Sequence, residues 1–286
     1  MLILKNNVKG FSNIGNTCYL NAGLQMIIHN KDLCNLIILN KKNNKILETL
    51  SNFIIEYYNT THDYIVPNKI KDYIEETNNM FRGSKQHDSS EFIFYLLDLI
   101  NDELNNQECN LLNSLYEVTS NIKIKCKLRS CLNISEHKEK SNYLLFDIKD
   151  SFTNLDDCYN EYKSRIKFEG DELYFCENCN DKRIASKRLQ ITNWPKHLIV
   201  ILKRFNQNNE KISKNNTNIY IPEIWKYDYK LKGIIYHSGS LHGGHYIYIG
   251  KHNNIWYSFN DNFISTVNIN DFNKFKNNGY IYYFEK

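Results

Sequence analysis

The residues most able to do chemistry lie in two short segments far apart in the chain. The first, residues 10–25, reads GFSNIGNTCYLNAGLQ and places Cys18 between a turn rich in Gly and Asn and a helix-like stretch. A thiol at a helix N-terminus faces unpaired backbone N–H groups and the positive end of the helix dipole, and both favour the thiolate. Cys18 is therefore a candidate nucleophile. The alternative is that it is one of eight cysteines and packs in a core.

The second segment supplies a base for such a nucleophile. Residues 237–246 read HSGSLHGGHY, and His245 begins an expected strand after two glycines that let the backbone pass close to a neighbour. A histidine at the mouth of a sheet, facing a cysteine on a helix, is a common way to build a thiolate–imidazolium pair. His245 is the predicted base, and His237 and His242 are the alternatives in the same segment.

An imidazole that acts as a base needs a partner that orients it. The next expected strand ends in WYSFND, so Asn260 or Asp261 would lie beside His245 if the two strands are antiparallel neighbours. This pattern indicates nucleophilic catalysis by a cysteine. The alternative is that these histidines are solvated residues of a loop.

Four other cysteines form two pairs. Cys176 and Cys179 have C-x-x-C spacing, and Cys126 and Cys131 lie upstream with four residues between them. Four thiolates from two hairpins make a closed tetrahedral zinc site, which is structural rather than catalytic. A redox role for the C-x-x-C pair is the alternative, but no βαβ pattern surrounds it. The cysteines therefore predict a structural zinc.

The first part of the chain reads as helical. Over about the first 110 residues, apolar residues recur with the period of a helix. Helices are expected at residues 20–30, 45–58 and 88–104, with a short one after Pro67. Asp88 is spaced as the N-cap of the last of these helices.

From about residue 115 the pattern becomes that of strands. Apolar and polar residues alternate at 116–126 and 144–148, and the apolar run HLIVILKRF at 197–205 predicts a central strand. Further strands are expected at residues 234–237, 246–250, 255–259 and 280–284, a hairpin turn at 252–254, a helix at 154–163 and a polar loop at 210–217. Helices followed by a long β region indicate an α+β fold.

Composition bounds the class of protein. A chain of 286 residues with 42% hydrophobic and 14% aromatic residues can bury a core and is not of the disordered class. The net charge of +4 is mild and spread out, so nothing calls for a nucleic-acid partner. No apolar run reaches the ~18 residues of a membrane span, and the N-terminus does not read as a signal peptide. We therefore expect a reducing compartment, the cytoplasm or the nucleus.

Four stretches carry a family resemblance. GFSNIGNTCYLNAGLQ resembles the cysteine box of the ubiquitin-specific proteases, QHDSSEFIFYLLD the helix that follows it, and HSGSLHGGHYIYIG…WYSFND the histidine box. YFCENC…ASKRLQITNWPKHLIVILKRF resembles the segment that leads from the zinc finger into the palm in that family. The stretches occur in the family's order and cover nearly the whole chain.

The resemblance implies a papain-like cysteine protease fold of the α+β class in one catalytic domain, residues 1–286. It divides the chain into a helical thumb over about residues 1–110, zinc-tipped fingers over about 115–190 and a palm over about 190–286, the last two being antiparallel β. The length is close to that of a catalytic domain without accessory domains.

The resemblance also assigns roles to single residues. It makes Cys18 the nucleophile, His245 the general base and Asn260 the third residue of the triad. Asn13 matches the residue whose side chain helps to form the oxyanion hole, and Asp88 matches the carboxylate that receives the basic tail of ubiquitin. Gly243, Gly244 and Tyr246 match the residues that line the channel for the Gly-Gly end of that tail. The zinc site is matched by Cys126, Cys131, Cys176 and Cys179. The first cysteine pair is wider than the family's usual spacing, with Leu128 where a cysteine would stand.

The implied activity is that of a deubiquitinating thiol isopeptidase, which hydrolyses the bond between the C-terminal Gly of ubiquitin and a Lys amine or a peptide. The implied partners are ubiquitin and ubiquitinated proteins, with no nucleic acid, no membrane and no cofactor for the catalysis itself. A monomer is expected. Two alternatives stay open: the same chemistry on another ubiquitin-like modifier, and a catalytically silent ubiquitin-binding module.

Overall fold

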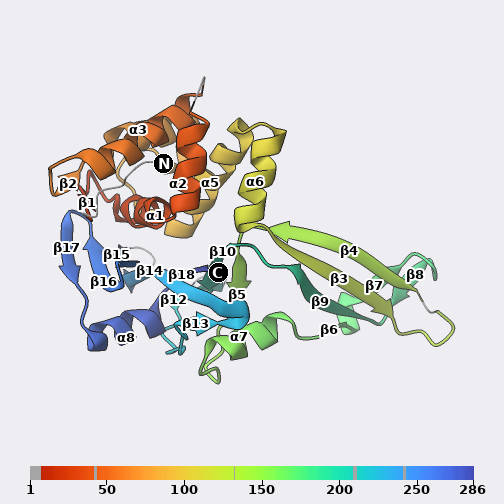
Figure 1. Ribbon diagram of the computed structural model, residues 1–286. Coiled ribbons are helices and arrows are strands. Elements are labelled where there is room, and N and C mark those ends of the chain that lie inside the picture. The colour runs from red at the N-terminus through yellow and green to blue at the C-terminus, as the bar shows by residue number, and fades with distance from the viewer. Residues whose placement is uncertain (1–7, 42–43, 132, 209–210, 241–242) are drawn as a thin grey trace.

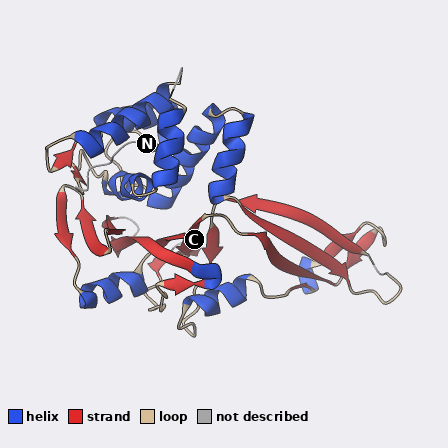
Figure 2. Cartoon of the chain, viewed as in Figure 1, coloured by secondary structure: helices blue, strands red, loops and turns tan. Residues whose placement is uncertain are grey.

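The computed structural model describes residues 8–41, 44–131, 133–208, 211–240 and 243–286. A layer of helices lies over a large sheet, and a narrow sheet projects to one side (Figure 1). Helices dominate the N-terminal part and strands the rest (Figure 2), so the predicted α+β class is confirmed. None of the helices in these ranges has both the length and the apolar character needed to cross a membrane.

The helical layer is the region expected as the thumb. It contains α1 (Cys18–Ile28), α2 (Lys31–Leu39), α3 (Lys45–Asn59), α4 (Asn68–Thr77), α5 (Ser89–Glu103) and α6 (Asn106–Tyr116). Helix α1 is buried on all sides because it lies between α5 and strand β15 of the large sheet. Helices α2 and α6 were not predicted. Asn30 and Asn105 cap them, and in a chain so rich in Asn this capping signal did not stand out.

The large sheet is the region expected as the palm. Its strand order is β17 (Phe263–Thr266), β16 (Ile255–Asn260), β15 (Gly243–His252), β14 (Tyr229–Ser240), β18 (Ile281–Glu285), β10 (His197–Leu202) and β5 (Leu144–Phe146), with β13 (Ile224–Trp225) paired to β14. Along this order, β5 is parallel to β10 and the other neighbours are antiparallel.

Both faces of the sheet are covered, so strand β10 carries apolar side chains on both of its faces. Ile199 and Ile201 join the core under the thumb, and Leu198 and Val200 join a second core on the opposite face. Helices α7 (Leu155–Tyr162) and α8 (Ile269–Asn278) close this second core. Each such side chain, fully buried, contributes about 1.5–3 kcal/mol.

The narrow sheet is the region expected as the fingers. Its order is β4 (Ile134–Ser141), β3 (Val118–Cys126), β9 (Ala185–Asn193) and β6 (Ile166–Phe168), and the small hairpin β7 (Tyr174–Cys176) and β8 (Asp181–Arg183) lies beyond it. The fingers extend away from the two large cores (Figure 1), and cysteines form the buried centre of their tip.

Two segments differ from the prediction. The polar stretch 210–217 was expected to be a loop, but β12 (Lys211–Lys214) pairs with β11 (Phe205–Asn208), because cross-strand backbone bonds do not require an apolar pattern. Residues 144–162 fall within the range expected for the fingers, but β5 pairs with β10 and α7 packs beneath it. Leu144 and Phe146 are fully buried, and the large core is where such side chains can be covered.

Candidate active site

Cys18 is the first residue of α1 and is 3% exposed. The turn before it is closed by the side chain of Asn13, whose Oδ1 accepts hydrogen bonds from the N–H of Thr17 at 3.0 Å and of Gly15 at 3.3 Å. Gly15 has a φ of 112° and Asn16 a φ of 55°, left-handed values that Gly and Asn adopt with the least strain. The composition of the turn therefore explains how the chain places Cys18 at a helix N-terminus.

His245 lies near the start of β15, where this strand runs past the end of its neighbour β16. Its Nε2 donates to Oδ1 of Asn260, the last residue of β16, at 2.6 Å. The thiol of Cys18 beside it raises the pKa of His245 to about 9, and Asn260 and Asp261 add to the rise while burial opposes it. The imidazole is therefore protonated at neutral pH and lies beside the sulfur of Cys18, where it can act as a general acid and base.

Asp261 connects the two catalytic segments. Its Oδ2 accepts from Nδ2 of Asn13 at 2.9 Å, and its Oδ1 accepts from Nδ2 of Asn21 at 2.8 Å. The same Oδ2 is 3.9 Å from Nε2 of His245. Gly10, in the short strand β1 (Gly10–Phe11), permits this approach, because a Cβ there would lie 2.6 Å from the backbone oxygen of Asp261. The sequence signalled Asp261 only through its place next to the third triad residue.

Asn13, the expected oxyanion donor, is exposed at the turn before the nucleophile. One of its two amide hydrogens is engaged with Asp261. An amide nitrogen carries two hydrogens, so the second one remains for a ligand at this turn. Asn13 thus closes the turn with its oxygen and keeps one N–H for chemistry.

Asp88 is the N-cap of α5, as predicted, and four donors hold its carboxylate. Ser90 donates through its backbone N–H and its hydroxyl, both at 2.6 Å, Tyr246 donates at 3.3 Å and Tyr280 at 2.9 Å. A carboxylate offers about four acceptor sites, so these bonds use the capacity of Asp88. The side chain of Glu91, one turn further along α5, is exposed and has no hydrogen bond or ion pair within the described ranges. The spacing of Asp88 and Glu91 predicted a capping box, but Glu91 does not bond back to the cap, and the sequence analysis gave it no role in the site.

Gly243 and Gly244 have different surroundings. A Cβ on Gly244 would lie 2.1 Å from Nε2 of His237, whereas no atom of the described residues lies within 4 Å of a Cβ on Gly243. The backbone N–H of Gly244 donates to Oε1 of Gln86 at 2.9 Å, and its C=O accepts from Nε2 of the same side chain at 2.9 Å. Gln86 is therefore a further residue of the site, and the sequence analysis assigned it no role.

His237, one of the two alternative bases, lies in a different environment from His245. His237 is 4% exposed and lies between two aromatic rings, and burial lowers its pKa to about 4. Its Nδ1 faces Nζ of Lys214 at 3.4 Å. His242 lies outside the described residues. Among the described histidines of this segment, His245 is the one beside Cys18.

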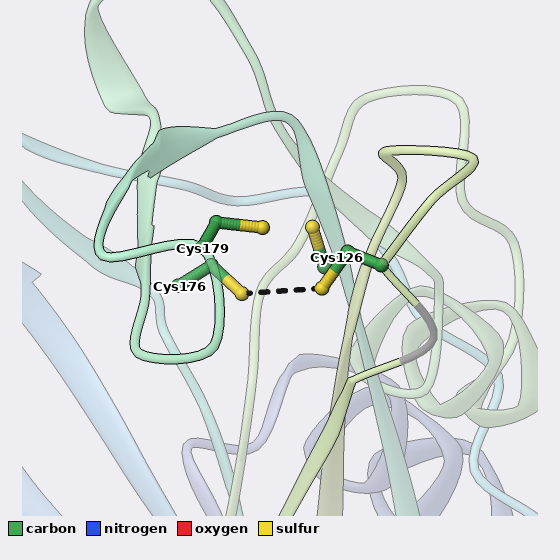
Figure 3. Close-up of side chains that lie close together, drawn as sticks. Cys126, Cys176 and Cys179 are labelled. Carbon is green, nitrogen blue, oxygen red and sulfur yellow. Dashed lines mark hydrogen bonds between the residues drawn. The ribbon is translucent and has the colours of Figure 1, made fainter.

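The two cysteine pairs meet at the tip of the fingers. The sulfur atoms of Cys126, Cys131, Cys176 and Cys179 lie within 4.8 Å of one another, and Figure 3 shows three of these side chains converging. The sulfurs of Cys131 and Cys176 are 3.7 Å apart. This is too long for a disulfide of about 2.05 Å and close to the roughly 3.8 Å of a tetrahedral site with Zn–S bonds of about 2.3 Å.

The surroundings of this cluster shift the pKa values of its thiols in opposite directions, lowering those of Cys131 and Cys176 and raising those of Cys126 and Cys179. Asn178 donates to the sulfur of Cys131 at 3.4 Å, and this bond is the main cause that lowers the pKa of the thiol to about 6. The wider spacing of the first pair does not keep Cys131 out of the cluster. The four cysteines therefore fit a structural zinc ion.

The arrangement of thumb, palm and fingers is the papain-like fold of the cysteine proteases, and its cleft brings together Cys18, His245 and Asn260. The family model described as Ubiquitin carboxyl-terminal hydrolase matches residues 9–284. The chain therefore belongs to the ubiquitin carboxyl-terminal hydrolase family, and the resemblance to the ubiquitin-specific proteases is confirmed.

Curated relatives agree with this assignment. Ubiquitin carboxyl-terminal hydrolase 48 of Danio rerio is 29% identical over 294 residues, covering 90% of this chain and 27% of the relative. Ubiquitin carboxyl-terminal hydrolase Usp2 of Drosophila melanogaster is 24% identical over 333 residues, covering 97% of this chain and 34% of the relative. The chain thus spans about a third of the length of these relatives.

Two solved structures of the SAGA DUB module Ubp8/Sgf11/Sus1/Sgf73 share the fold. The module bound to monoubiquitin has a TM-score of 0.85 at 24% identity, covering 100% of this chain and 70% of that chain. The module bound to ubiquitin aldehyde has a TM-score of 0.82 at 23% identity, with the same coverage. At these identities the likeness establishes the fold.

Proposed function

We propose that the protein is a cysteine deubiquitinase that hydrolyses the bond between the C-terminal Gly of ubiquitin and a Lys amine or a peptide. The observation that carries the proposal is the grouping of Cys18, His245 and Asn260 in a chain of this family. A silent binding module would not need an imidazole whose pKa a neighbouring thiol raises to about 9.

The reaction follows from the charge state of the pair. The thiolate of Cys18 attacks the carbonyl carbon of the terminal Gly and forms a tetrahedral intermediate. The imidazolium of His245 then gives its proton to the leaving amine as the C–N bond breaks, which leaves a thioester. The neutral imidazole next takes a proton from water, whose oxygen attacks the thioester carbonyl carbon. The C–S bond then breaks and Cys18 leaves as the thiolate, while the product acid loses its proton to solvent and departs as the carboxylate. Asn260 keeps the ring of His245 oriented through both steps.

Asn13 and the backbone N–H of Cys18 are the proposed donors to the oxyanion. One donor of this kind lowers the barrier by about 3 kcal/mol. Asp261 holds Asn13 through its other amide hydrogen, so this donor is ordered before the substrate binds.

The tail of ubiquitin is basic, and we propose that two carboxylates share its recognition. Asp88 is the predicted receiver, but its four hydrogen bonds hold it between the thumb and the palm. Glu91 keeps an unengaged carboxylate one turn away and is the stronger candidate for a direct ion pair with the tail. Gly243, Gly244 and Tyr246 would line the channel for the Gly-Gly end, where Gly243 leaves open space among the described residues.

We propose that the four cysteines at the tip of the fingers hold a structural zinc ion, which would cross-link β3 and the β7–β8 hairpin. The protein would act on ubiquitin and ubiquitinated proteins as a monomer, with residues 1–286 as one catalytic unit. Free thiols in both the active site and the cluster suit a reducing compartment, the cytoplasm or the nucleus.

Reaction with ubiquitin that carries a C-terminal electrophile tests the proposal. The wild-type protein should form one covalent adduct, Cys18→Ala should form none, and Cys109→Ala, which removes a half-buried thiol outside both sites, should still form it. An adduct with another ubiquitin-like modifier but not with ubiquitin would show that the protein acts on that modifier by the same chemistry. Binding of ubiquitin without any adduct would leave the silent binding module as the function.

A further inference from the structure

One short segment of the thumb touches the neighbours of both catalytic residues. This connecting segment, residues 84–90, leads into α5. On the nucleophile side, the backbone oxygen of its first residue accepts from Nδ2 of Asn16 at 2.7 Å, and Ser89 donates its hydroxyl to the backbone oxygen of Tyr19 at 2.9 Å. Asn16 and Tyr19 stand on either side of Cys18, so the connecting segment fixes the nucleophile from both directions along the chain.

The same segment holds the neighbours of the base. Gln86 makes its two hydrogen bonds of 2.9 Å with the backbone of Gly244, and Asp88 accepts from the hydroxyl of Tyr246 at 3.3 Å. Gly244 and Tyr246 stand on either side of His245. The connecting segment therefore spans the cleft and sets where the base lies relative to the nucleophile.

The strand that carries the base needs such support. The pairing of β15 with β16 begins at Tyr248, so residues 243–246 pair with β14 alone. Two consecutive glycines offer no side chains to pack there, and Gly239, opposite Gly244, has a φ of 93°. A glutamine side chain ends in the same donor and acceptor as a peptide group. Gln86 thus supplies at the open edge of β15 the two hydrogen bonds that a neighbouring strand would supply.

We propose that Gln86 is a positioning residue for the reaction, which holds His245 in register with Cys18 through its paired hydrogen bonds with Gly244. The inference rests on the catalytic roles proposed for Cys18 and His245. Both bonds are exposed, so they contribute little to the stability of the whole protein. Their consequence is geometric, and a misplacement of about 1 Å in a catalytic group can cost about 10²-fold in rate.

The test uses substitutions at Gln86 and a matched control. Gln86→Met keeps the length of the side chain and removes both bonds, while Gln86→Glu keeps an acceptor for the Gly244 N–H and loses the donor for its C=O. Gln107→Met makes the same change at an exposed glutamine on α6, far from the cleft in the sequence. Thermal melting of each variant shows that it is folded.

The decisive readout does not involve ubiquitin. The rate at which iodoacetamide alkylates Cys18 is measured against pH, and NMR follows the titration of His245. Cys18, Asp261 and His237 are the titratable groups that act on or respond to His245, and Gln86→Met changes none of their charges. In Gln86→Met the pKa of His245 should fall by about one unit, because the imidazolium lies less well against the thiolate.

Turnover gives the second readout. For Gln86→Met, kcat should fall about 10-fold to 10²-fold with little change in KM, with Gln86→Glu between it and the wild type and Gln107→Met unchanged. A folded Gln86→Met protein with the wild-type alkylation profile and the wild-type His245 titration would overturn the inference. If Gln86→Met does not fold, Gln86→Leu, which also removes both bonds and adds no charge, decides by the same measurements. If the titration shifts as expected but no ubiquitin substrate is turned over, the proposed function fails and the positioning role stands.

Discussion

The cleft between thumb and palm and the tip of the fingers both assemble a site from distant segments, but different forces hold them. Cys18 lies on a helix buried in the large core, and the strand of His245 continues into the same core. At the tip, Cys126, Cys131 and Cys176 form a cluster of their own, and among the described residues Tyr174 and Cys179 are the hydrophobic ones partly buried against it. Packing therefore suffices to place the catalytic residues, whereas the cysteine cluster has almost no packing of its own.

The energies behind this difference are of different origin. In the thumb and palm, many buried side chains each contribute about 1.5–3 kcal/mol. A structural zinc ion bound by four thiolates supplies about 10–16 kcal/mol in small peptides, and where no core exists this binding energy is folding energy. Loss of a catalytic group should therefore stop the reaction without unfolding the protein. Loss of a metal ligand should unfold the finger tip and leave the reactivity of Cys18 unchanged.

The largest expected effect is at the base. His245→Ala should lower turnover of a ubiquitin substrate by about 10³-fold or more, because both proton transfers lose their carrier. The melting temperature should barely change, since the side chain is 38% exposed. His62→Ala, at an exposed histidine outside the site, is the control. If instead His242→Ala abolishes turnover and His245→Ala does not, the base has been assigned to the wrong histidine.

Metal removal should have the opposite signature. Purified protein should contain nearly one zinc per chain, and Cys176→Ser or a strong chelator should remove it and expose the finger tip, around residues 126–131 and 174–183, to limited proteolysis. Alkylation of Cys18 should continue at the wild-type rate, because the thumb and palm keep their cores. Cys109→Ser, outside the cluster, is the matched control. A metal-free protein whose fingers resist the protease would contradict the proposed dependence on zinc.

The two glycines before His245 should differ in how much an added methyl group destabilises the protein. Gly244→Ala should reduce the free energy of unfolding by about 1–3 kcal/mol, because its Cβ would lie 2.1 Å from Nε2 of the buried His237. Gly243→Ala should change it by less than about 0.5 kcal/mol, because in the described part of the chain no atom lies within 4 Å of the added carbon. Chemical denaturation measures both. Equal losses for the two variants would mean that His237 does not limit the space at Gly244.

The smallest expected effect is the contribution of the catalytic pair to stability. The pKa of His245 in the folded protein, about 9, is above its ordinary value of 6.5. The stabilisation is therefore complete below about pH 6.5 and is lost as the pH rises through 9, and exposure of the side chain keeps it small. Cys18→Ala removes the largest cause of the shift. Unfolding free energies between pH 6 and 9.5 should thus fall less steeply in Cys18→Ala than in the wild type, and identical slopes would contradict this origin.

Much of the site could be predicted from the sequence because the catalytic groups sit in local motifs. The turn before Cys18, the glycines before His245 and the C-x-x-C pair each combine a reactive residue with the backbone that presents it. The long periodic helices α3 and α5 and the apolar strand β10 were predictable for the same reason. Their signals lie within one stretch of chain.

The residues that join these motifs could not be predicted in the same way. The roles of Gln86 and Glu91 depend on what lies opposite them in the folded chain, and a single sequence does not contain those distances. Asp261 was expected only as an alternative partner of His245, and its bonds to Asn13 and Asn21 were not predicted. The pairing of residues 144–146 with the palm sheet could not be predicted for a related reason. Their alternating pattern predicted a strand but not the sheet in which it would pair.

The position of β18 in the palm has a consequence during synthesis of the protein on the ribosome. This strand, residues 281–285, lies between β14 and β10 at the centre of the large sheet. Chains are synthesised from the N-terminus at about 5–20 residues per second, so Cys18 leaves the ribosome long before β18 does. A nascent chain therefore has its nucleophile without a completed sheet to present the base. Hydrolysis should begin only after translation has passed residue 285, which delays the activity until the fold is whole.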